Sequence, residues 1–294
     1  MAAEAVSRRT VYLVLLLLAL LPMVMACTIQ PTPAIYKIAL LAPFEGRYRE
    51  VGYDALYAAR LALAEANVTQ IELLAVDDGG TTARAAERAQ ALAQDSAVLT
   101  AIAVGFAAAD AETQVAFTDI PIIVAGNWGA QPVGAETFLL TRFSDDSATD
   151  ALFYVGARVL NETPVQDWVS SAAPPDADFS ARYQATDSFA PPPTPLATLV
   201  YDATRMAILA TANGTTRTSV AHALDQIDYT GINGEVRFAA HTWADAPEIR
   251  YHLDNGEVVA LAANATQRSR IVVFLCKTTV KISRRIIEPL ISVG

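Results

Sequence analysis

The segment from residue 44 to residue 50 holds the densest group of side chains that could bind a small molecule. It contains Glu45, Arg47 and Tyr48, whose charges and hydroxyl can hydrogen-bond a polar solute. The same composition also describes a solvated surface loop. However, the apolar run Lys37–Ala42 comes directly before it and predicts a buried strand. Because α/β proteins bind ligands beyond the carboxyl ends of their strands, we predict Glu45 and Tyr48 as ligand-binding residues.

A second candidate group follows the apolar run Ile120–Ala125. Asn127 can both donate and accept hydrogen bonds, and Trp128 offers a face on which a solute can stack. A tryptophan here would equally well pack against its own domain, so both interpretations stay open.

Residues that could support catalysis or metal binding are scattered. Asp77 and Asp78 are adjacent, and neighbouring residues on a strand point to opposite faces. A helix is expected just after them, where carboxylates interact favourably with its dipole. The three histidines, at positions 222, 241 and 252, lack the spacing of metal ligands, and the sequence has no nucleophile elbow or phosphate-binding loop. We therefore predict no enzyme activity, no metal and no cofactor.

Strands and helices alternate in the first half of the chain. Apolar runs predict strands over residues 37–42, 71–76, 98–104 and 120–125. Helical periodicity between them predicts helices from Gly52 to Asn67, from Thr81 or Thr82 to Gln94, and from Ala108 to Phe117. This alternation predicts the α/β class, with a Rossmann-like parallel sheet flanked by helices and joined by right-handed crossovers.

The second half of the chain is less regular. Short strands are expected at 151–155 and 168–170, and one or two helical turns at 179–186. A proline-rich extended segment at 188–195 precedes a clear helix over 196–212 and a shorter helix over 219–227. Residues 231–238 read as a turn into a strand, and residues 248–261 as a hairpin.

The N-terminus has the pattern of an export signal. Arg8 and Arg9 precede an apolar run, which ends in the sequence Val24-Met25-Ala26-Cys27. This ending resembles the lipobox of bacterial lipoproteins, in which the cysteine is acylated. The alternative is an uncleaved single-span anchor. Either way, we expect an exported protein on the outer face of the cytoplasmic membrane, held there through its anchor.

The charge and the cysteine content of the chain argue against a nucleic-acid partner and a structural disulfide. The formal net charge is −10, and the body of the chain carries no basic footprint, so nucleic acid is not an expected partner. The chain has only two cysteines, and if Cys27 carries lipid, Cys276 has no partner for a structural disulfide. The last thirty residues are basic. They are either an extension that does not belong to the fold, such as a frame-shifted end, or a segment that contacts anionic lipid headgroups.

Four segments together resemble the type 1 periplasmic-binding proteins of the leucine/isoleucine/valine-binding group. They are KIALLAPFEGRYREVGYDALYAARLALAEAN, VDDGG, RYQATDSFAPPPTPLATLVYDATR and GINGEVRF, of which Tyr201-Asp202-Ala203 is the most specific part. The resemblance implies two Rossmann-like lobes that close on a ligand. It also implies that the protein captures a small solute, with an amino acid as one candidate, for an ABC permease.

The chain departs from this family pattern in three ways. Too few residues lie between the family-like halves for a complete second lobe, which would need on the order of 100 residues. The loop after the third strand, Gly105 to Ala109, lacks the serine or threonine hydroxyl that the family offers to an amino-acid carboxylate. The resemblance therefore implies that backbone groups of Phe106, Ala107 and Ala108, and of Ala125 after the fourth strand, contact the ligand here. The basic tail lies beyond the resemblance. A truncated remnant that no longer binds a solute is therefore the alternative function, and the stretch 144–170 should discriminate the two.

We expect seven segments in this chain. They are a signal peptide (1–26), a lipid-anchored linker (27–34), the first part of an N-terminal lobe (35–142), a reduced second lobe (143–177), a return segment (178–228), a crossover with hairpin (229–261) and a basic tail (262–294).

Overall fold

The computed structural model describes residues 12–13, 34–134, 136–142, 150, 167–254 and 257–261. The chain divides into two compact units, Met1–Ala34 and Ile35–Gly294, and the second contains the site considered below. The predicted signal segment 1–26, Cys27, the strand 151–155 and the tail 262–294 lie outside the described residues or almost entirely so. No helix in the described part of the chain combines the length and apolar character needed to cross a membrane.

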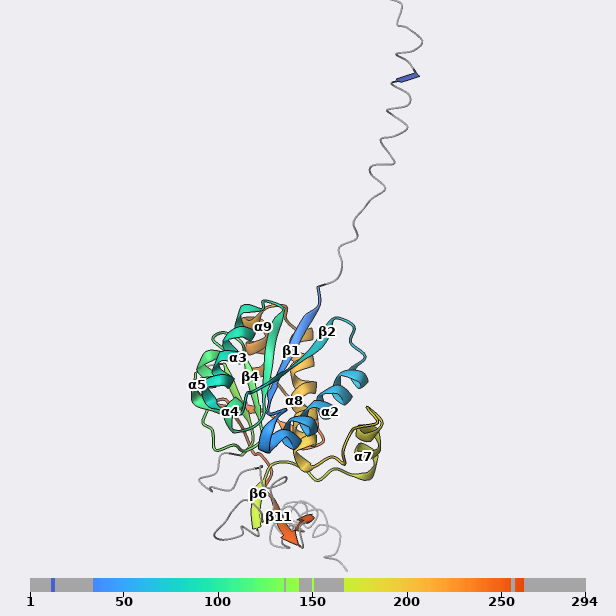
Figure 1. Ribbon diagram of the computed structural model, residues 1–294, viewed down its shortest axis with the longest axis vertical. Coiled ribbons are helices and arrows are strands. Elements are labelled where there is room, and N and C mark those ends of the chain that lie inside the picture. Colours follow the sequence, from blue (N-terminus) through green and yellow to red (C-terminus); the bar gives the residue numbers. More distant parts are fainter. Residues whose placement is uncertain are drawn as a thin grey trace, which may run out of the picture. The chain divides into compact units, whose positions relative to one another are not determined.

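The main sheet has seven strands in the order β2-β1-β3-β4-β5-β10-β9 (Figure 1). Five of them run parallel in succession, and β10 extends this order before pairing antiparallel with β9. Their bounds are β1 Tyr36–Ala42, β2 Ile71–Asp77, β3 Val98–Ala103, β4 Ile122–Ala125, β5 Thr137–Leu140, β9 Phe238–Ala239 and β10 Thr242–Trp243. The predicted α/β fold with a parallel sheet is confirmed.

Helices cover both faces of this sheet. Figure 1 shows α2 (Arg49–Ala66) and α8 (Pro195–Ala212) on one side, and α3 (Thr82–Gln94), α4 (Phe106–Ala109) and α5 (Ala111–Ala116) on the other. The central strands are fully buried as a result, which explains why their sequences are continuous apolar runs rather than alternating ones. Burial of this layered core supplies the main stabilisation of the fold.

Smaller elements complete the described structure. The helices α7 (Ala177–Gln184) and α9 (Arg217–Asp225) flank α8 in sequence, and β7 (Tyr229–Gly231) forms a hairpin with β8 (Gly234–Val236). A three-stranded antiparallel sheet joins β6 (Asp167–Ser170), β11 (Ile249–Asp254) and β12 (Glu257–Ala260). The predicted hairpin at 248–261 and the strand at 168–170 are therefore confirmed. Most of the discriminating stretch 144–170 lies outside the described residues.

Two helix predictions need correction. The first helix begins at Arg49, three residues before the predicted Gly52, and a 3-10 turn, η1 (Gly46–Tyr48), leads into it. The single helix predicted for 108–117 is wrong, because the chain forms α4 and α5 with Asp110 between them. Asp110 has extended backbone angles, and its side chain accepts a hydrogen bond from the Glu112 N–H, so it starts a new helix instead of continuing the old one.

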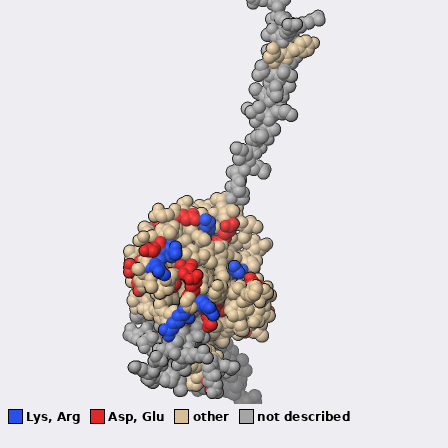
Figure 2. Space-filling model, in the orientation of Figure 1, with Lys and Arg blue, Asp and Glu red and all other residues tan. Residues whose placement is uncertain are grey.

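Charged side chains are mixed on the surface. On the face shown in Figure 2, acidic and basic residues lie interspersed rather than gathered by sign. The shown face therefore offers no extended field of one sign to a highly charged partner.

Candidate functional site

The loops that follow β1, β2, β3 and β4 line one cavity of about 730 Å³, which we call the strand-end cavity. They meet there because the carboxyl ends of parallel neighbouring strands lie at the same edge of a sheet. Its side-chain lining combines aromatic rings with a few charged and polar groups, namely Glu45, Arg47, Tyr48, Asp78, Thr81, Thr82, Phe106, Asp110, Trp128 and Gln131.

Three aromatic rings from three different loops form a continuous wall of this cavity. The ring centroids of Tyr48 and Phe106 lie 5.5 Å apart, and those of Phe106 and Trp128 lie 5.4 Å apart in an edge-to-face arrangement. Phe106 is 39% exposed, whereas Trp128 is buried. The Arg47 guanidinium lies 5.5 Å from the centroid of the Tyr48 ring. This wall therefore presents apolar faces that already accommodate one cation.

Asp77 fixes the first loop of the cavity. Its Oδ1 accepts hydrogen bonds from the backbone N–H groups of Phe44 (2.7 Å) and Glu45 (3.1 Å), and its Oδ2 accepts one from Gly79 (2.9 Å). Both carboxylate oxygens thus hold backbone at the ends of β1 and β2. The structural role expected for Asp77 agrees with this geometry.

Gly52 brings α2 close to the same loop. A Cβ atom at this position would lie 2.1 Å from the carbonyl oxygen of Pro43, which is far inside van der Waals contact. Only glycine therefore allows the first turn of α2 to approach the end of β1 so closely.

Asp78 is the most buried charged group of the cavity lining, with 2% of its surface exposed. Its Oδ1 accepts a hydrogen bond from the Gly80 N–H at 2.7 Å. No hydrogen-bond or ion-pair partner of its Oδ2 is found among the described residues, and a Cβ placed on Gly105 would be 3.8 Å from that oxygen. Burial raises the pKa of Asp78, the Gly80 hydrogen bond opposes this rise, and the charge of Asp77 adds to it.

The structure brings most of the predicted site residues together. Five of the eight line the strand-end cavity, and they are Glu45, Tyr48, Phe106, Ala107 and Trp128. The Trp128 indole N–H donates to the Ala125 carbonyl at 2.8 Å, which agrees with packing against its own domain. Its side chain also lines the cavity, and stacking on a ligand stays a prediction.

The other three predicted residues do not line the cavity. Ala108 is buried within α4, and the Ala125 carbonyl accepts the hydrogen bond from Trp128. The Asn127 backbone N–H donates to the Asp150 carboxylate at 2.7 Å, and its side-chain oxygen accepts from the Gly129 N–H. Their role in ligand binding stays a prediction.

Sequence reasoning did not select Asp78, Asp110 or Gln131 as ligand contacts. Asp78 was interpreted together with Asp77 as a structural carboxylate, which holds for only one of its two oxygens. Its position could have indicated a ligand contact, because Asp78 directly follows β2, the immediate neighbour of β1 in the sheet.

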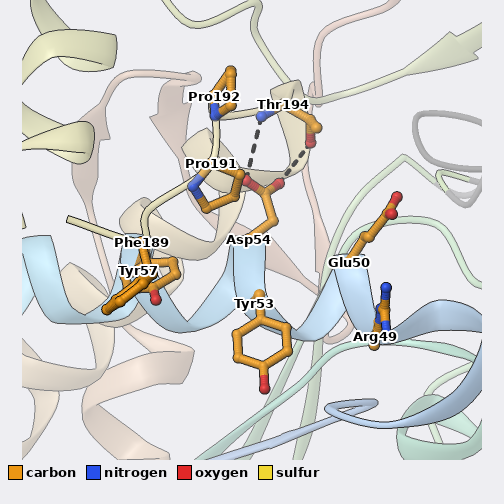
Figure 3. Close-up of a pocket in the computed structure, with 9 residues that line it drawn as sticks. All are labelled: Arg49, Glu50, Tyr53, Asp54, Tyr57, Phe189, Pro191, Pro192 and Thr194. Atoms are coloured by element: carbon orange, nitrogen blue, oxygen red, sulfur yellow. Dashed lines mark hydrogen bonds between the residues drawn. The ribbon is translucent and has the colours of Figure 1, made fainter. Parts of the chain in front are cut away.

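A second cavity, of about 480 Å³, lies between α2 and the proline-rich segment before α8 (Figure 3). We call it the proline-side cavity. Figure 3 shows Arg49, Glu50, Tyr53, Asp54 and Tyr57 on α2, with Asp54 pointing toward Thr194. The remaining lining residues belong to the proline-rich segment and are Phe189, Pro191, Pro192 and Thr194.

Asp54 joins the two sides of the proline-side cavity. Its Oδ2 accepts a hydrogen bond from the Thr194 hydroxyl at 2.6 Å, and its Oδ1 accepts from the Thr194 N–H (3.3 Å) and the Tyr183 hydroxyl (3.0 Å) (Figure 3). Asp54 is 1% exposed, so these donors replace water around its carboxylate.

The described residues contain no group of three or more side chains that could hold a metal ion.

Comparison with known proteins shows which family this chain resembles. A family model described as "Periplasmic binding protein" matches residues 35–161. This match confirms the resemblance to periplasmic-binding proteins that was stated from the sequence. No curated protein matches the sequence.

Solved structures match over most of the chain. The branched-chain amino acid transporter substrate binding protein LivJ from Streptococcus pneumoniae, in complex with isoleucine, is 15% identical with a TM-score of 0.60, and the match covers 78% of this chain and 99% of that one. The leucine binding protein LivK from Thermotoga maritima is 14% identical with a TM-score of 0.57, covering 78% and 98%. A solute binding protein of an ABC transporter from R. palustris, in complex with benzoate, is 14% identical with a TM-score of 0.57, covering 78% and 96%. At these identities the likeness establishes the periplasmic-binding-protein fold.

Proposed function

We propose that this protein binds a small organic solute in the strand-end cavity and presents it to an ABC importer. The observation that carries the proposal is that loops after β1, β3 and β4 place Tyr48, Phe106 and Trp128 on one wall of one cavity. Such convergence of distant loops on one hollow at the carboxyl edge of the sheet is typical of ligand sites in α/β proteins.

The dimensions and lining of the cavity support this function. Its volume of about 730 Å³ falls within the range of about 300 to 1,000 Å³ that is common for small-molecule sites. Aromatic rings provide apolar contact area, and a few charged groups can orient a polar end of the solute. The cavity is therefore suited to a compact solute with both an apolar and a polar part.

The fold relatives suggest the first solutes to test. LivJ is described with isoleucine, LivK as a leucine binding protein, and the R. palustris protein with benzoate. All three ligands are compact, with an apolar group and a charged end. We therefore propose an amino acid as the first candidate class.

The proposal includes a location outside the cytoplasm, anchored to the outer face of the cytoplasmic membrane through lipid on Cys27. It is supported by the signal-like sequence before Cys27 and by the family match. The permease of an ABC importer is the corresponding macromolecular partner. Mass spectrometry of the purified chain would test the anchor, because lipid on Cys27 adds mass and cleavage before Cys27 removes residues 1–26.

The alternative function, a truncated remnant, is not favoured by the comparisons. The match covers 99% of the LivJ structure, which supports the function of a binding protein for this chain. The three matched structures named above are described as binding proteins, two of them of transporters, which also supports a function without catalysis.

A thermal-shift screen of the full chain in mild detergent tests the proposed function. A solute that binds only the folded state adds about 2.7 kcal/mol of stability at a hundredfold excess over its dissociation constant. We expect one chemical class among amino acids, amides, amines and small carboxylic acids to raise the melting temperature. A cooperative transition that no compound shifts would instead indicate a folded protein without binding activity.

A further inference from the structure

We propose that the strand-end cavity selects solutes that carry an ammonium group, and that Asp78 together with the aromatic wall of Phe106 and Trp128 holds that group. This inference rests on the proposed function, and it goes further by naming the charge of the solute and the side chains that select it.

The charges around the cavity favour a cation. Among the described lining residues, Glu45, Asp78 and Asp110 carry carboxylates, whereas Arg47 is the one basic side chain. Arg47 lies over the ring of Tyr48, is exposed, and forms no ion pair with Asp78. A cavity lined mainly by one sign of charge concentrates ligands of the opposite sign.

Asp78 supplies a specific point of attachment. It is buried, its Oδ1 is occupied by the Gly80 N–H, and its Oδ2 has no hydrogen-bond partner among the described residues of the protein. No lysine, arginine or histidine of the described chain forms an ion pair with it. A buried carboxylate is unfavourable unless it is paired, and an ammonium group offers three N–H donors to such an oxygen.

The aromatic wall provides the second half of the recognition. Tyr48, Phe106 and Trp128 form a chain of ring contacts along the lining, and the Arg47 guanidinium already lies 5.5 Å from the first of these rings. Aromatic faces attract cations electrostatically, most strongly where water is excluded. Asp78 and this wall line the same cavity, and Asp78 Oδ2 lies beside Gly105, the residue before Phe106, at 3.8 Å from the position of a Cβ there. We therefore assign one ammonium group to both.

A carboxylate finds less support in this cavity. The segment Gly105–Ala109, at the end of β3, carries no side-chain hydroxyl or amide donor. The Gly80 N–H is already bound to Asp78, and the side-chain donors of Thr81, Thr82 and Gln131 in the lining are uncharged. Among the described lining residues, Arg47 alone offers a charged donor for an acid, so an amino acid would place its carboxylate toward Arg47 and its ammonium group toward Asp78.

Isothermal titration of the full chain in mild detergent with two matched sets of solutes tests this inference. The first set carries an ammonium group with N–H donors and consists of leucine and isopentylamine. The second set lacks it and consists of isocaproate, which is leucine without its amine, and benzoate. We expect solutes of the first set to bind and those of the second to bind at least about tenfold more weakly, since a hydrogen bond to a charged group contributes about that factor or more.

Two variants locate the selectivity. Asp78→Asn keeps an oxygen for the Gly80 N–H but removes the charge, and we expect it to abolish the preference for ammonium solutes. Glu72→Gln removes the same charge from an exposed position of β2 outside the cavity, and its preference should match the wild type. If Asp78→Asn does not fold by circular dichroism, Phe106→Leu replaces it, because leucine retains apolar volume without an aromatic face.

The outcomes separate this inference from the function on which it rests. Binding of isocaproate or benzoate as tight as that of the amines would overturn the inference while leaving a solute-binding protein. An unchanged preference in a folded Asp78→Asn or Phe106→Leu variant would overturn the assigned residues. Absence of binding by every compound in both sets would overturn the inference and the proposed function together.

Discussion

The rings of Phe106 and Trp128 lie 5.4 Å apart and meet edge to face, although they follow different strands of the sheet. Phe106 begins the short helix α4 after β3, and Trp128 lies in the loop after β4. The contact exists because β3 and β4 are parallel neighbours whose carboxyl ends meet. The contact joins two loops into one wall of the strand-end cavity. A substitution of either ring should therefore change the affinity for a solute.

Replacing Phe106 with alanine should weaken solute binding with little effect on stability. Its ring is 39% exposed, so its removal costs little packing, but the loss of one aromatic wall should raise the dissociation constant about tenfold. Phe189→Ala is the matched control, because Phe189 is 84% exposed and lines the proline-side cavity instead. Equal loss of affinity in both variants, measured by isothermal titration, would contradict the assignment of the site.

Gly52→Ala should destabilise the fold, although alanine is the better helix former by about 1 kcal/mol. The added Cβ would lie 2.1 Å from the Pro43 carbonyl oxygen, which forces α2 away from the end of β1. We expect a loss of about 1 to 3 kcal/mol in the free energy of unfolding, together with weaker solute binding because Pro43 lines the cavity. Urea denaturation measures the first effect, and a variant more stable than wild type would show that the close approach is absent.

Asp202→Ala should cost about 3 kcal/mol or more, because it leaves several buried donors without an acceptor. The Asp202 carboxylate accepts hydrogen bonds from the N–H (2.9 Å) and side-chain amide (2.6 Å) of Asn233, and from the Tyr229 hydroxyl (2.9 Å). These bonds attach α8 to the β7–β8 hairpin. The exposed Asp225→Ala in α9 serves as control and should change stability by no more than about 0.5 kcal/mol. Equal melting temperatures of the two variants would refute this role.

Asp150 should make stability depend on pH. Burial raises its pKa from the ordinary 3.8 to about 6, so the folded state binds the proton more tightly than the unfolded state. The resulting stabilisation is complete below about pH 4 and is lost as the pH rises through about 6. Relative to Asp150→Asn, the wild-type free energy of unfolding should fall by up to about 3 kcal/mol between about pH 4 and pH 7. Parallel pH profiles of both proteins in urea denaturation would contradict this shift.

The elements predicted correctly are those determined by local pattern. Buried strands such as β1 and β3 are continuous apolar runs, and α8 has both helical periodicity and a proline in its first turn. The break between α4 and α5 was missed because alanine-rich sequence favours a continuous helix, while Asp110 works as a cap only in the extended conformation that its surroundings select. The two-residue strand β10 exists only through pairing with β5 and β9, which no local pattern encodes.

The candidate site was predicted in part for the same reason. Strand ends can be read from sequence, and they located Glu45, Tyr48, Phe106 and Trp128. Which oxygen of Asp78 remains without a partner depends on how β2 and β3 place their loops, so it required the structure. The proline-side cavity likewise depends on contact between Asp54 and Thr194, which are 140 positions apart in the chain.

Fluorine NMR of the protein labelled with fluorotryptophan tests the central claim, that a solute binds beside Trp128, most directly. The chain has three tryptophans, so the spectrum is simple, and Trp128→Phe assigns one signal. A solute from the thermal-shift screen should move the Trp128 resonance in a saturable manner and leave that of Trp243, which is buried in β10, in place. If calorimetry shows saturable binding while the Trp128 resonance does not move, the solute binds elsewhere in the protein, and the account is contradicted.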